Sequence, residues 1–248
     1  MKIKQVLISQ QEPKADSSPY HELERQNIKV NYAAFIEVEG QSAREVRNQK
    51  IDFAKFSAVI LTSKNSVDHF FRVAEELRFP VPDAMKYFCQ SEAIAFYLQK
   101  YIVYRKRKIH IGGKEFSDLM PLFNKQKELK YLIPCGETLS EENTNILNDS
   151  EIDWTKVCLY KTKSINLSQL MITKYDLIAF YSPAGILSLV ENFPDYQQNE
   201  TAIATFGKAT TDAAKKAGLR VEIEAPNKEN PSMASALSKY AKLVNGKK

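Results

Sequence analysis

Two serines follow apolar runs, and after each serine the spacing of the hydrophobic residues changes. Ser63 ends the run in "AVILTSKNSVDHFF" (58–71), and Ser182 ends the run in "LIAFYSPAGILSLV" (177–190). A serine in this place caps a helix, at whose start about four backbone amides lack partners and partial positive charge collects. Such a helix start can bind a carboxylate or a phosphate. The two stretches therefore indicate sites for an acidic ligand, although capping alone explains either of them singly.

Two further strand-to-helix turns offer the same chemistry. They lie at Gln90-Ser91 and at Gly207-Lys208, and Gly207 permits close approach of a ligand to the backbone. Thr210 follows on the first helical turn, where local capping explains its hydroxyl as well as ligand binding does. The residues that we expect to contact the ligand are Thr62, Ser63, Lys64, Ser91, Ser182, Pro183, Ala184, Gly207, Lys208 and Thr210.

Composition limits the classes of protein to which the chain can belong. With 248 residues and 44% apolar content, it is a globular protein of one large domain or two ordinary ones. No apolar run reaches the roughly 18 residues that span a bilayer, and "MKIKQVLISQ" lacks the apolar core of a signal peptide. We therefore expect a soluble, cytoplasmic protein with no membrane partner.

Metal sites, disulfides and nucleic-acid binding are not indicated. The three cysteines lie far apart in apolar surroundings and the three histidines have no metal-ligand spacing, so reduced core cysteines and no metal are expected. The net charge is only +5, and the basic stretch "YRKRKIHIGGK" (104–114) is best explained as a solvated loop or strand edge. No nucleic-acid-binding module is present, and "GGK" lacks the first glycine and the following hydroxyl residue of a phosphate loop.

The segments that position these residues alternate between strand and helix patterns. Strands are predicted at 2–10, 28–38, 57–62, 85–90, 108–111, 130–135, 156–162, 175–181, 201–206 and 219–225. Helices are predicted at 19–27, 64–77, 91–101, 115–125, 183–193 and 207–218, after a capping box at Thr138 and Glu141, and from Pro231 onward. Pro121 should bend or end the helix that contains it. This alternation is typical of α/β folds with parallel sheets flanked by helices.

Related positions recur about half a chain apart. Ser63 and Ser182 are 119 residues apart, Gln90 and Gly207 are 117 apart, Ser9 and Cys135 are 126 apart, and Tyr32 and Tyr160 are 128 apart. The order of the matching pieces differs between the two halves. We therefore expect one discontinuous α/β domain from residues 1–37 and 164–248 and one inserted domain at 40–162. Crossing linkers near 36–40 and 160–165 would join them, with a cleft between the domains.

The ordered set of stretches resembles the uroporphyrinogen-III synthase family. The resemblance is carried by "ILTSKNSVDHFF", "YLIPCGETLSEE", "VCLYKT", "AFYSPAGILSL", "TFGKATTDAAKKAGLRV" and "APNKENPSMASAL", and it covers essentially the whole chain. It implies two similar domains, each a parallel sheet flanked by helices, joined by a two-stranded linker. It also implies an enzyme that needs no cofactor. Nothing in the sequence demands more than a monomer, which we therefore expect.

The function implied by the resemblance is that of a lyase in porphyrin and haem biosynthesis. The enzyme closes hydroxymethylbilane, a linear tetrapyrrole with eight carboxylates, to uroporphyrinogen III with loss of water and inversion of ring D through a spiro intermediate. Tyr160 becomes the candidate proton donor to the departing hydroxyl. A transient contact with the preceding pathway enzyme is a further expectation.

The chain departs from the family pattern, and other classes of protein stay open. "ISQQEP" replaces an arginine-containing element after the first strand, Gln90 stands where a glycine is common, and "CGETLSEE" alters a further turn. The main alternative is a non-catalytic two-domain binding protein for an acidic small molecule. A nucleotide-dependent transferase is a weaker one, because the glycine fingerprint is missing. The third alternative is a protein with a purely structural interaction role.

Overall fold

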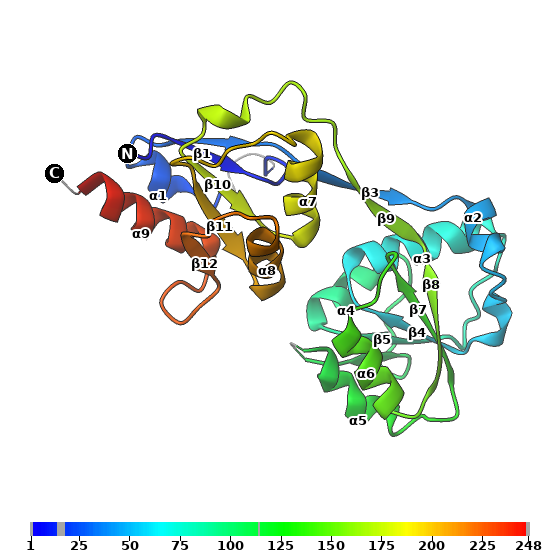
Figure 1. Cartoon of the computed structure of the whole chain (residues 1–248). Coiled ribbons are helices and arrows are strands. Elements are labelled where there is room, and N and C mark those ends of the chain that lie inside the picture. The colour runs from blue at the N-terminus through cyan, green and yellow to red at the C-terminus, as the bar shows by residue number, and fades with distance from the viewer. Residues whose placement is uncertain (1, 14–17, 114, 247–248) are drawn as a thin grey trace. The chain divides into compact units, whose positions relative to one another are not determined.

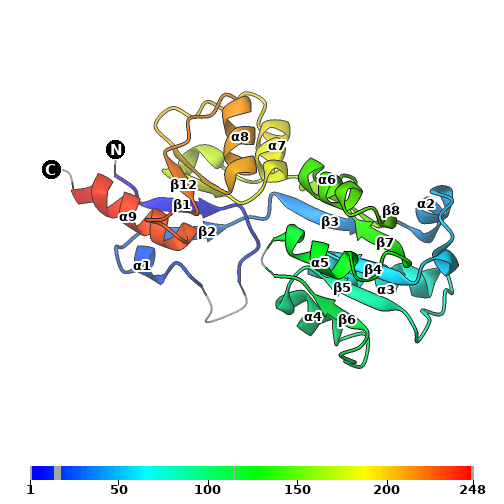
Figure 2. The ribbon, with the colours of Figure 1, turned by 90° about the horizontal axis from the view of Figure 1, so that it is seen from below.

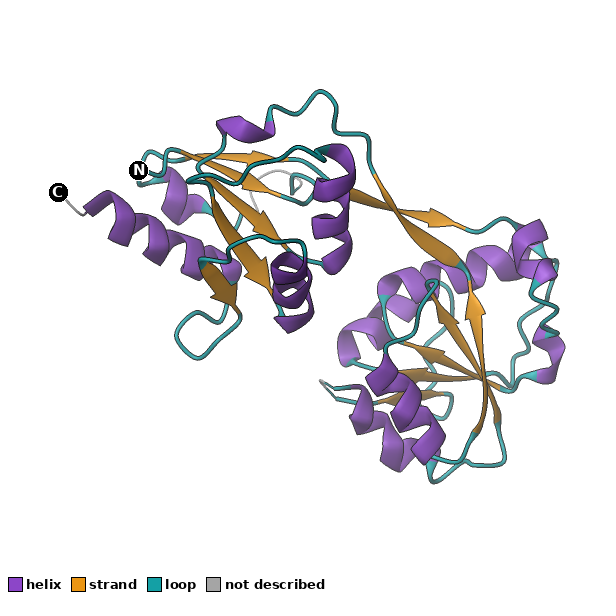
Figure 3. Ribbon diagram, viewed as in Figure 1, coloured by secondary structure: helices purple, strands orange, loops and turns teal. Residues whose placement is uncertain are grey.

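The computed structural model describes residues 2–13, 18–113 and 115–246, and its chain divides into two compact units (Figure 1). The terminal unit comprises Met1–Glu37 and Lys163–Lys248, and the inserted unit comprises Val38–Thr162. Figure 2 shows the same ribbon from below, and Figure 3 distinguishes the strands of each unit from the helices around them. Within the described residues, no helix is long and apolar enough to cross a membrane.

The terminal unit is built on one five-stranded sheet. Its strands are β1 (Gln5–Ile8), β2 (Lys29–Tyr32), β10 (Leu177–Phe180), β11 (Ala202–Phe206) and β12 (Ile223–Ala225). Its helices are α1 (His21–Glu24), α7 (Pro183–Asn192), α8 (Lys208–Lys216) and α9 (Met233–Gly246). The strand order is β12-β11-β10-β1-β2, and every neighbouring pair is parallel.

The inserted unit has a second five-stranded parallel sheet. Its strands are β4 (Ala58–Leu61), β5 (Lys86–Cys89), β6 (Ile109–Ile111), β7 (Lys130–Cys135) and β8 (Asp153–Cys158), in the order β6-β5-β4-β7-β8. Its helices are α2 (Ala43–Asn48), α3 (Lys64–Glu76), α4 (Glu92–Leu98), α5 (Met120–Phe123) and α6 (Glu141–Asp149).

The two sheets have one topology. The strands β4, β5, β6, β7 and β8 take the places of β10, β11, β12, β1 and β2. Three of the four sequence offsets therefore join equivalent strands or their ends, but the pairing of Tyr32 with Tyr160 was wrong, because Tyr32 lies in β2 and Tyr160 lies beyond β8, in β9. The strands β1 and β2, which correspond to β7 and β8, come first in the chain of the terminal unit. The sequence-predicted fold class, two similar parallel α/β units, is confirmed.

Each sheet buries both faces, because side chains alternate along a strand. Along β4, Val59 and Leu61 join a core beneath α2, α3 and α4, whereas Ala58 and Ile60 join a second core beneath α5 and α6. The terminal unit likewise has one core against α1 and α9 and another against α7 and α8. Continuous apolar runs such as "AVIL" are typical of strands buried in this way.

A two-stranded sheet links the units. It pairs β3 (Ile36–Gly40) with β9 (Tyr160–Ser164). At one end the amide of Gln41 donates to the carbonyl of Leu159 over 2.8 Å, and at the other the amide of Ile165 donates to Phe35 over 3.0 Å.

Several element boundaries differ from the sequence-based prediction. The runs 28–38 and 156–162 were each expected to form one strand, but each contains two, because the chain leaves a five-stranded sheet to enter the linker. The helix predicted over 19–27 is limited to α1, and Asn27 takes the left-handed conformation, with φ of 58°. The last helix begins at Met233 instead of at Pro231.

Two helix starts were also assigned to the wrong residue or missed. Ser140, and not Thr138, caps α6, accepting a hydrogen bond from the amide of Asn143 over 3.2 Å. The helix α2 was not predicted, although Ser42 and Glu45 form its capping box. Pro121 interrupts the predicted helix as expected, by standing in the first turn of α5 after a 3₁₀ turn.

The core of the inserted unit beneath α5 and α6 can be tested at Phe88. This side chain is fully buried and packs against three aromatic rings at centroid distances of 4.6, 5.6 and 5.0 Å. Phe88→Ala should lower the free energy of unfolding by about 3–5 kcal/mol, and Phe96→Ala, at a side chain 76% exposed, by less than about 0.5. Denaturant titration followed by the fluorescence of Trp154, which packs on the same core, measures both. Equal effects of the two changes would contradict this account of the core.

Candidate functional site

In each unit the predicted ligand-binding turns lie at one edge of the sheet. The strands of a parallel sheet end at a common edge, and there β4 leads through Ser63 into α3, and β5 leads through Ser91 into α4. In the terminal unit β10 leads through Ser182 into α7, and β11 leads through Gly207 into α8. The sequence-predicted residues therefore form two groups, one in each unit.

The strand order of each sheet predicts where a ligand would bind along the carboxyl ends of its strands. In the inserted unit β5 and β6 lie on one side of β4, and β7 and β8 lie on the other, so the strand order switches between β4 and β7. In the terminal unit it switches in the same way between β10 and β1. Ligands of open α/β sheets bind in the crevice outside the carboxyl ends of strands at such a switch point. Ser63 and Ser182 both lie at these switch points.

The Ser63 turn satisfies most of its own donors. The Ser63 hydroxyl accepts from the amide of Ser66 over 3.0 Å, and the buried Ser66 hydroxyl accepts from the amides of Thr62 and Ser63 over 3.2 and 3.1 Å. Within the described residues, the amides of Lys64 and Asn65 have no hydrogen-bond partner. The turn thus keeps two donors of the first helical turn open.

The Ser182 turn leaves more donors open. Its serine caps α7 by accepting from the amide of Gly185 over 3.2 Å, and Pro183 has no amide hydrogen to satisfy. Gly185 stands 119 residues after Ser66 and occupies the equivalent position, but it has no hydroxyl. In the part of the chain that the structure describes, the amides of Tyr181, Ser182 and Ala184 therefore have no hydrogen-bond partner.

The two outer turns are simpler. Gly207 has φ of 84°, a left-handed conformation that favours glycine, and its amide donates to the carbonyl of Ala225 over 2.6 Å. The amides of Lys208 and Ala209 lack partners among the residues described here, whereas Thr210 is only 2% exposed. Ser91 makes no side-chain capping bond, and α4 after it is short.

Tyr160 lies at the switch point of the inserted unit. Its ring stacks on that of His69 with centroids 5.0 Å apart, and a Cβ added to Gly136 would lie 3.2 Å from its Cε2 atom. Burial, the largest cause, raises the pKa of the phenol, and interactions with the Ser63 side chain and the Gly136 backbone oppose that rise in part. The phenol is therefore protonated at neutral pH.

The lysines beside the turns and the thiols have local roles. The Nζ atom of Lys64 lies 5.3 Å from the centroid of the Tyr97 ring, and Lys161 pairs with Glu45 over 3.6 Å. Burial raises the pKa of Cys89 to about 12 and that of Cys135 to about 11, so both are inert thiols. Among the residues described, no cluster of three or more metal-ligating side chains occurs.

Sequence reasoning missed three residues that shape these turns. Ser66 and Gly185 decide how many amides each turn leaves open, and their shared offset from the capping serines was a signal that could have identified them. Gly136 leaves room for the Tyr160 ring. His69 was considered only as a metal ligand, and its contact with Tyr160 has no sequence signal.

Two parallel α/β units of one topology, with helix starts at their switch points, define a duplicated, circularly rearranged α/β protein. A family model described as uroporphyrinogen-III synthase HemD matches residues 19–235. The chain therefore belongs to the uroporphyrinogen-III synthase family of lyase-type enzymes in haem biosynthesis.

Solved structures show the same fold. The chain is similar to uroporphyrinogen-III synthetase from Helicobacter pylori, with a TM-score of 0.62, 17% identity, and coverage of 97% of this chain and 99% of that one. It is also similar to a mutant uroporphyrinogen III synthase from the extremely thermophilic bacterium Thermus thermophilus, with a TM-score of 0.58, 12% identity, and coverage of 98% and 100%. A comparison with curated protein sequences gives no significant match.

The difference between the two serine turns can be tested at Gly185. A Cβ there would meet its nearest neighbours at ordinary distances of 3.5–3.9 Å, so a serine fits. Gly185→Ser should supply the hydroxyl that Ser66 supplies in the other unit and slow hydrogen exchange at the amides of Tyr181 and Ser182 about fivefold, as one net hydrogen bond of about 1 kcal/mol implies. Gly185→Ala is the matched control, because it adds the Cβ without the hydroxyl. Equal protection of these amides in both variants would contradict the assignment.

Proposed function

We propose that this chain converts hydroxymethylbilane to uroporphyrinogen III. Loss of the terminal hydroxyl as water leaves an electrophilic azafulvene, and the substituted carbon of ring D attacks it to form a spiro intermediate. Fragmentation and reclosure then invert that ring. The observation that carries the proposal is the family match over residues 19–235, and no finding favours the binding-protein alternative.

The open amides suit a substrate with many carboxylates. We assign the peripheral carboxylates to the amides that begin α3, α7 and α8, with help from the hydroxyls of Ser63 and Ser182. Each such contact at a helix start stabilises the bound anion by about 0.3–2 kcal/mol, so no single one is indispensable. Thr62, Lys64, Ser91, Pro183, Ala184, Gly207, Lys208 and Thr210 remain in the proposed binding set.

Positioning is the main task of the protein in this reaction. The uncatalysed closure joins the unsubstituted carbon of ring D and gives the uninverted isomer, so the enzyme must favour one geometry over an easier one. Fixing reacting groups in place can lower a barrier by several kcal/mol, with roughly 7–11 as the upper range.

Tyr160 is the proposed proton donor to the departing hydroxyl. Its raised pKa keeps the phenol protonated at neutral pH, which a general acid requires. The proton released when the macrocycle closes restores the phenol, so the step needs no external acid. In the same proposal the enzyme acts without a cofactor, as a cytoplasmic monomer, and meets the preceding pathway enzyme transiently.

Isomer analysis tests the proposed reaction. Porphobilinogen and purified hydroxymethylbilane-forming enzyme supply the substrate, and oxidised products are separated by chromatography. With this chain present, the type III isomer should dominate, and without it the type I isomer should. A product mixture that the chain does not change would exclude the proposed activity.

The role of Tyr160 has its own test. Tyr160→Phe removes the proton donor and keeps the ring, so kcat should fall about 10²-fold or more while KM changes little. Tyr104→Phe, at a tyrosine 45% exposed, should leave both constants unchanged. Full turnover with an unchanged isomer ratio in Tyr160→Phe would show that the phenol neither donates the proton nor orients the leaving group.

A further inference from the structure

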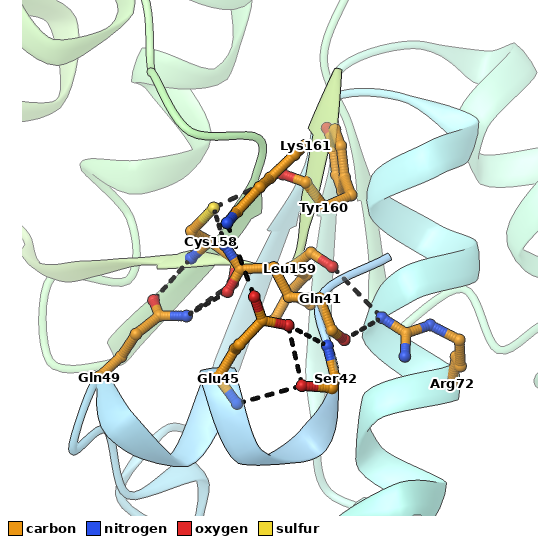
Figure 4. A network of polar contacts seen from close by, with 9 residues as sticks. All are labelled: Gln41, Ser42, Glu45, Gln49, Arg72, Cys158, Leu159, Tyr160 and Lys161. Carbon is orange, nitrogen blue, oxygen red and sulfur yellow. Dashed lines mark hydrogen bonds and ion pairs between the residues drawn. The ribbon is translucent and has the colours of Figure 1, made fainter. Parts of the chain in front are cut away.

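The main chain that carries Tyr160 is fixed by side chains from two helices. The β8 strand ends at Cys158 and β9 begins at Tyr160, so Leu159 is a break between two strands of different sheets. The direction of the Tyr160 ring depends on this short segment. Figure 4 shows Gln49, the residue that follows α2, reaching this segment on one side and Arg72 of α3 reaching it on the other.

Gln49 binds both backbone polar groups of Cys158. The amide of Cys158 donates to Oε1 of Gln49 over 2.9 Å, and Nε2 of Gln49 donates to the carbonyl of Cys158 over 2.7 Å. The carboxamide therefore replaces a neighbouring strand at the end of β8. The buried Gln41 adds a contact from its Nε2 atom to Sγ of Cys158 over 3.0 Å.

Arg72 binds the next residue along the chain. Its Nη2 atom donates to the carbonyl of Leu159, just before β9, over 3.2 Å and to that of Gln41, just after β3, over 2.9 Å. Its Nε atom donates to Nδ1 of His69 over 3.2 Å, and the His69 ring stacks on Tyr160. One guanidinium thus contacts both the backbone before Tyr160 and the ring beside it.

We propose that Arg72, supported by Gln49, is a positioning residue that sets the direction of the Tyr160 phenol. The inference rests on the role proposed for Tyr160. Neither side chain needs to contact the substrate. Burial and the neighbouring Arg72 lower the pKa of His69, so its imidazole is neutral at physiological pH and can accept the hydrogen bond from Arg72.

Variants of Arg72 separate this role from simple stabilisation. Arg72→Met should lower kcat about tenfold through misplacement of Tyr160, with KM within about twofold, and Arg72→Lys should recover part of the loss. Gln49→Met is a second variant that breaks the bonds to Cys158 and should change kcat in the same direction. Glu76→Gln is the control, because it removes the 2.6 Å ion pair of Arg72 and leaves the carbonyl contacts in place.

A spectroscopic signal makes the test independent of the proposed chemistry. With tyrosine labelled by ¹³C at Cζ and Tyr160→Phe used for assignment, the Tyr160 resonance should shift in Arg72→Met and Gln49→Met and stay in place in Glu76→Gln. Thermal unfolding of each variant confirms that all are folded at the assay temperature. An unmoved resonance in both Arg72→Met and Gln49→Met would overturn the positioning role, whether or not Tyr160 is catalytic.

A double variant decides whether Arg72 acts through Tyr160. If it does, Arg72→Met should cost little further activity once Tyr160 is phenylalanine, because the two changes remove one function. Losses in kcat that multiply in the double variant would contradict the inference. If Tyr160→Phe alone keeps full activity, the proposed acid fails, and the resonance still reports on positioning.

Discussion

Parallel strand pairing is the constraint on which the rest of the structure depends. Because every neighbouring pair in each five-stranded sheet is parallel, all strands of a sheet end at the same edge. Each strand that leads into a helix brings unpaired amides to that edge. Among the residues that the structure describes, several unpaired backbone donors are in this way collected at the carboxyl ends of the strands of each sheet.

The two units use one topology for different chemistry. At the switch point of the inserted unit, Ser66 satisfies two amides and the Tyr160 phenol lies beside the turn. At the equivalent point of the terminal unit, Gly185 leaves those amides open. Tyr32, which the sequence offsets paired with Tyr160, lies within β2 and hydrogen-bonds Ser18 over 3.0 Å, whereas Tyr160 lies beyond β8, in β9. The terminal unit is therefore better suited to binding anions and the inserted unit to supplying a protonated acid.

Much of the architecture could be predicted from the sequence, because buried parallel strands and serine-capped helices have strong local signals. The runs that end at Ser63 and Ser182 are examples. The break at Leu159 had no such signal, since its cause is the departure of the chain from one sheet into another. The side chains that bind the backbone before Tyr160 come from the end of α2 and from α3, and Gln49 is 109 residues from the Cys158 that it binds. No local pattern encodes such a meeting. For the same reason no sequence pattern singled out Arg72.

The helices α3 and α7, which follow the capping serines, also bind the backbone beside the connecting strands β3 and β9. In the inserted unit α3 begins at the Ser63 turn, and its Arg72 binds the carbonyls of Gln41 and Leu159, which flank β3 and β9. In the terminal unit α7 begins at the Ser182 turn, and there the Ser188 hydroxyl donates to the carbonyl of Phe35 over 2.6 Å while Asn192 donates to Ile165 over 2.9 Å.

The side chains that bind the connecting strands differ, but the helices are equivalent, and each joins an open helix start to the strands that link the units. An anion bound at either turn therefore acts on the same rigid element that holds the linker backbone. The carbonyls of Leu159 and Phe35 also accept backbone amides, from Gln41 and Ile165, so the side chains of these helices add a second hydrogen bond at each end of the linker. The open amides at the turns and the placement of Tyr160 are thus consequences of one arrangement of helices on parallel strands.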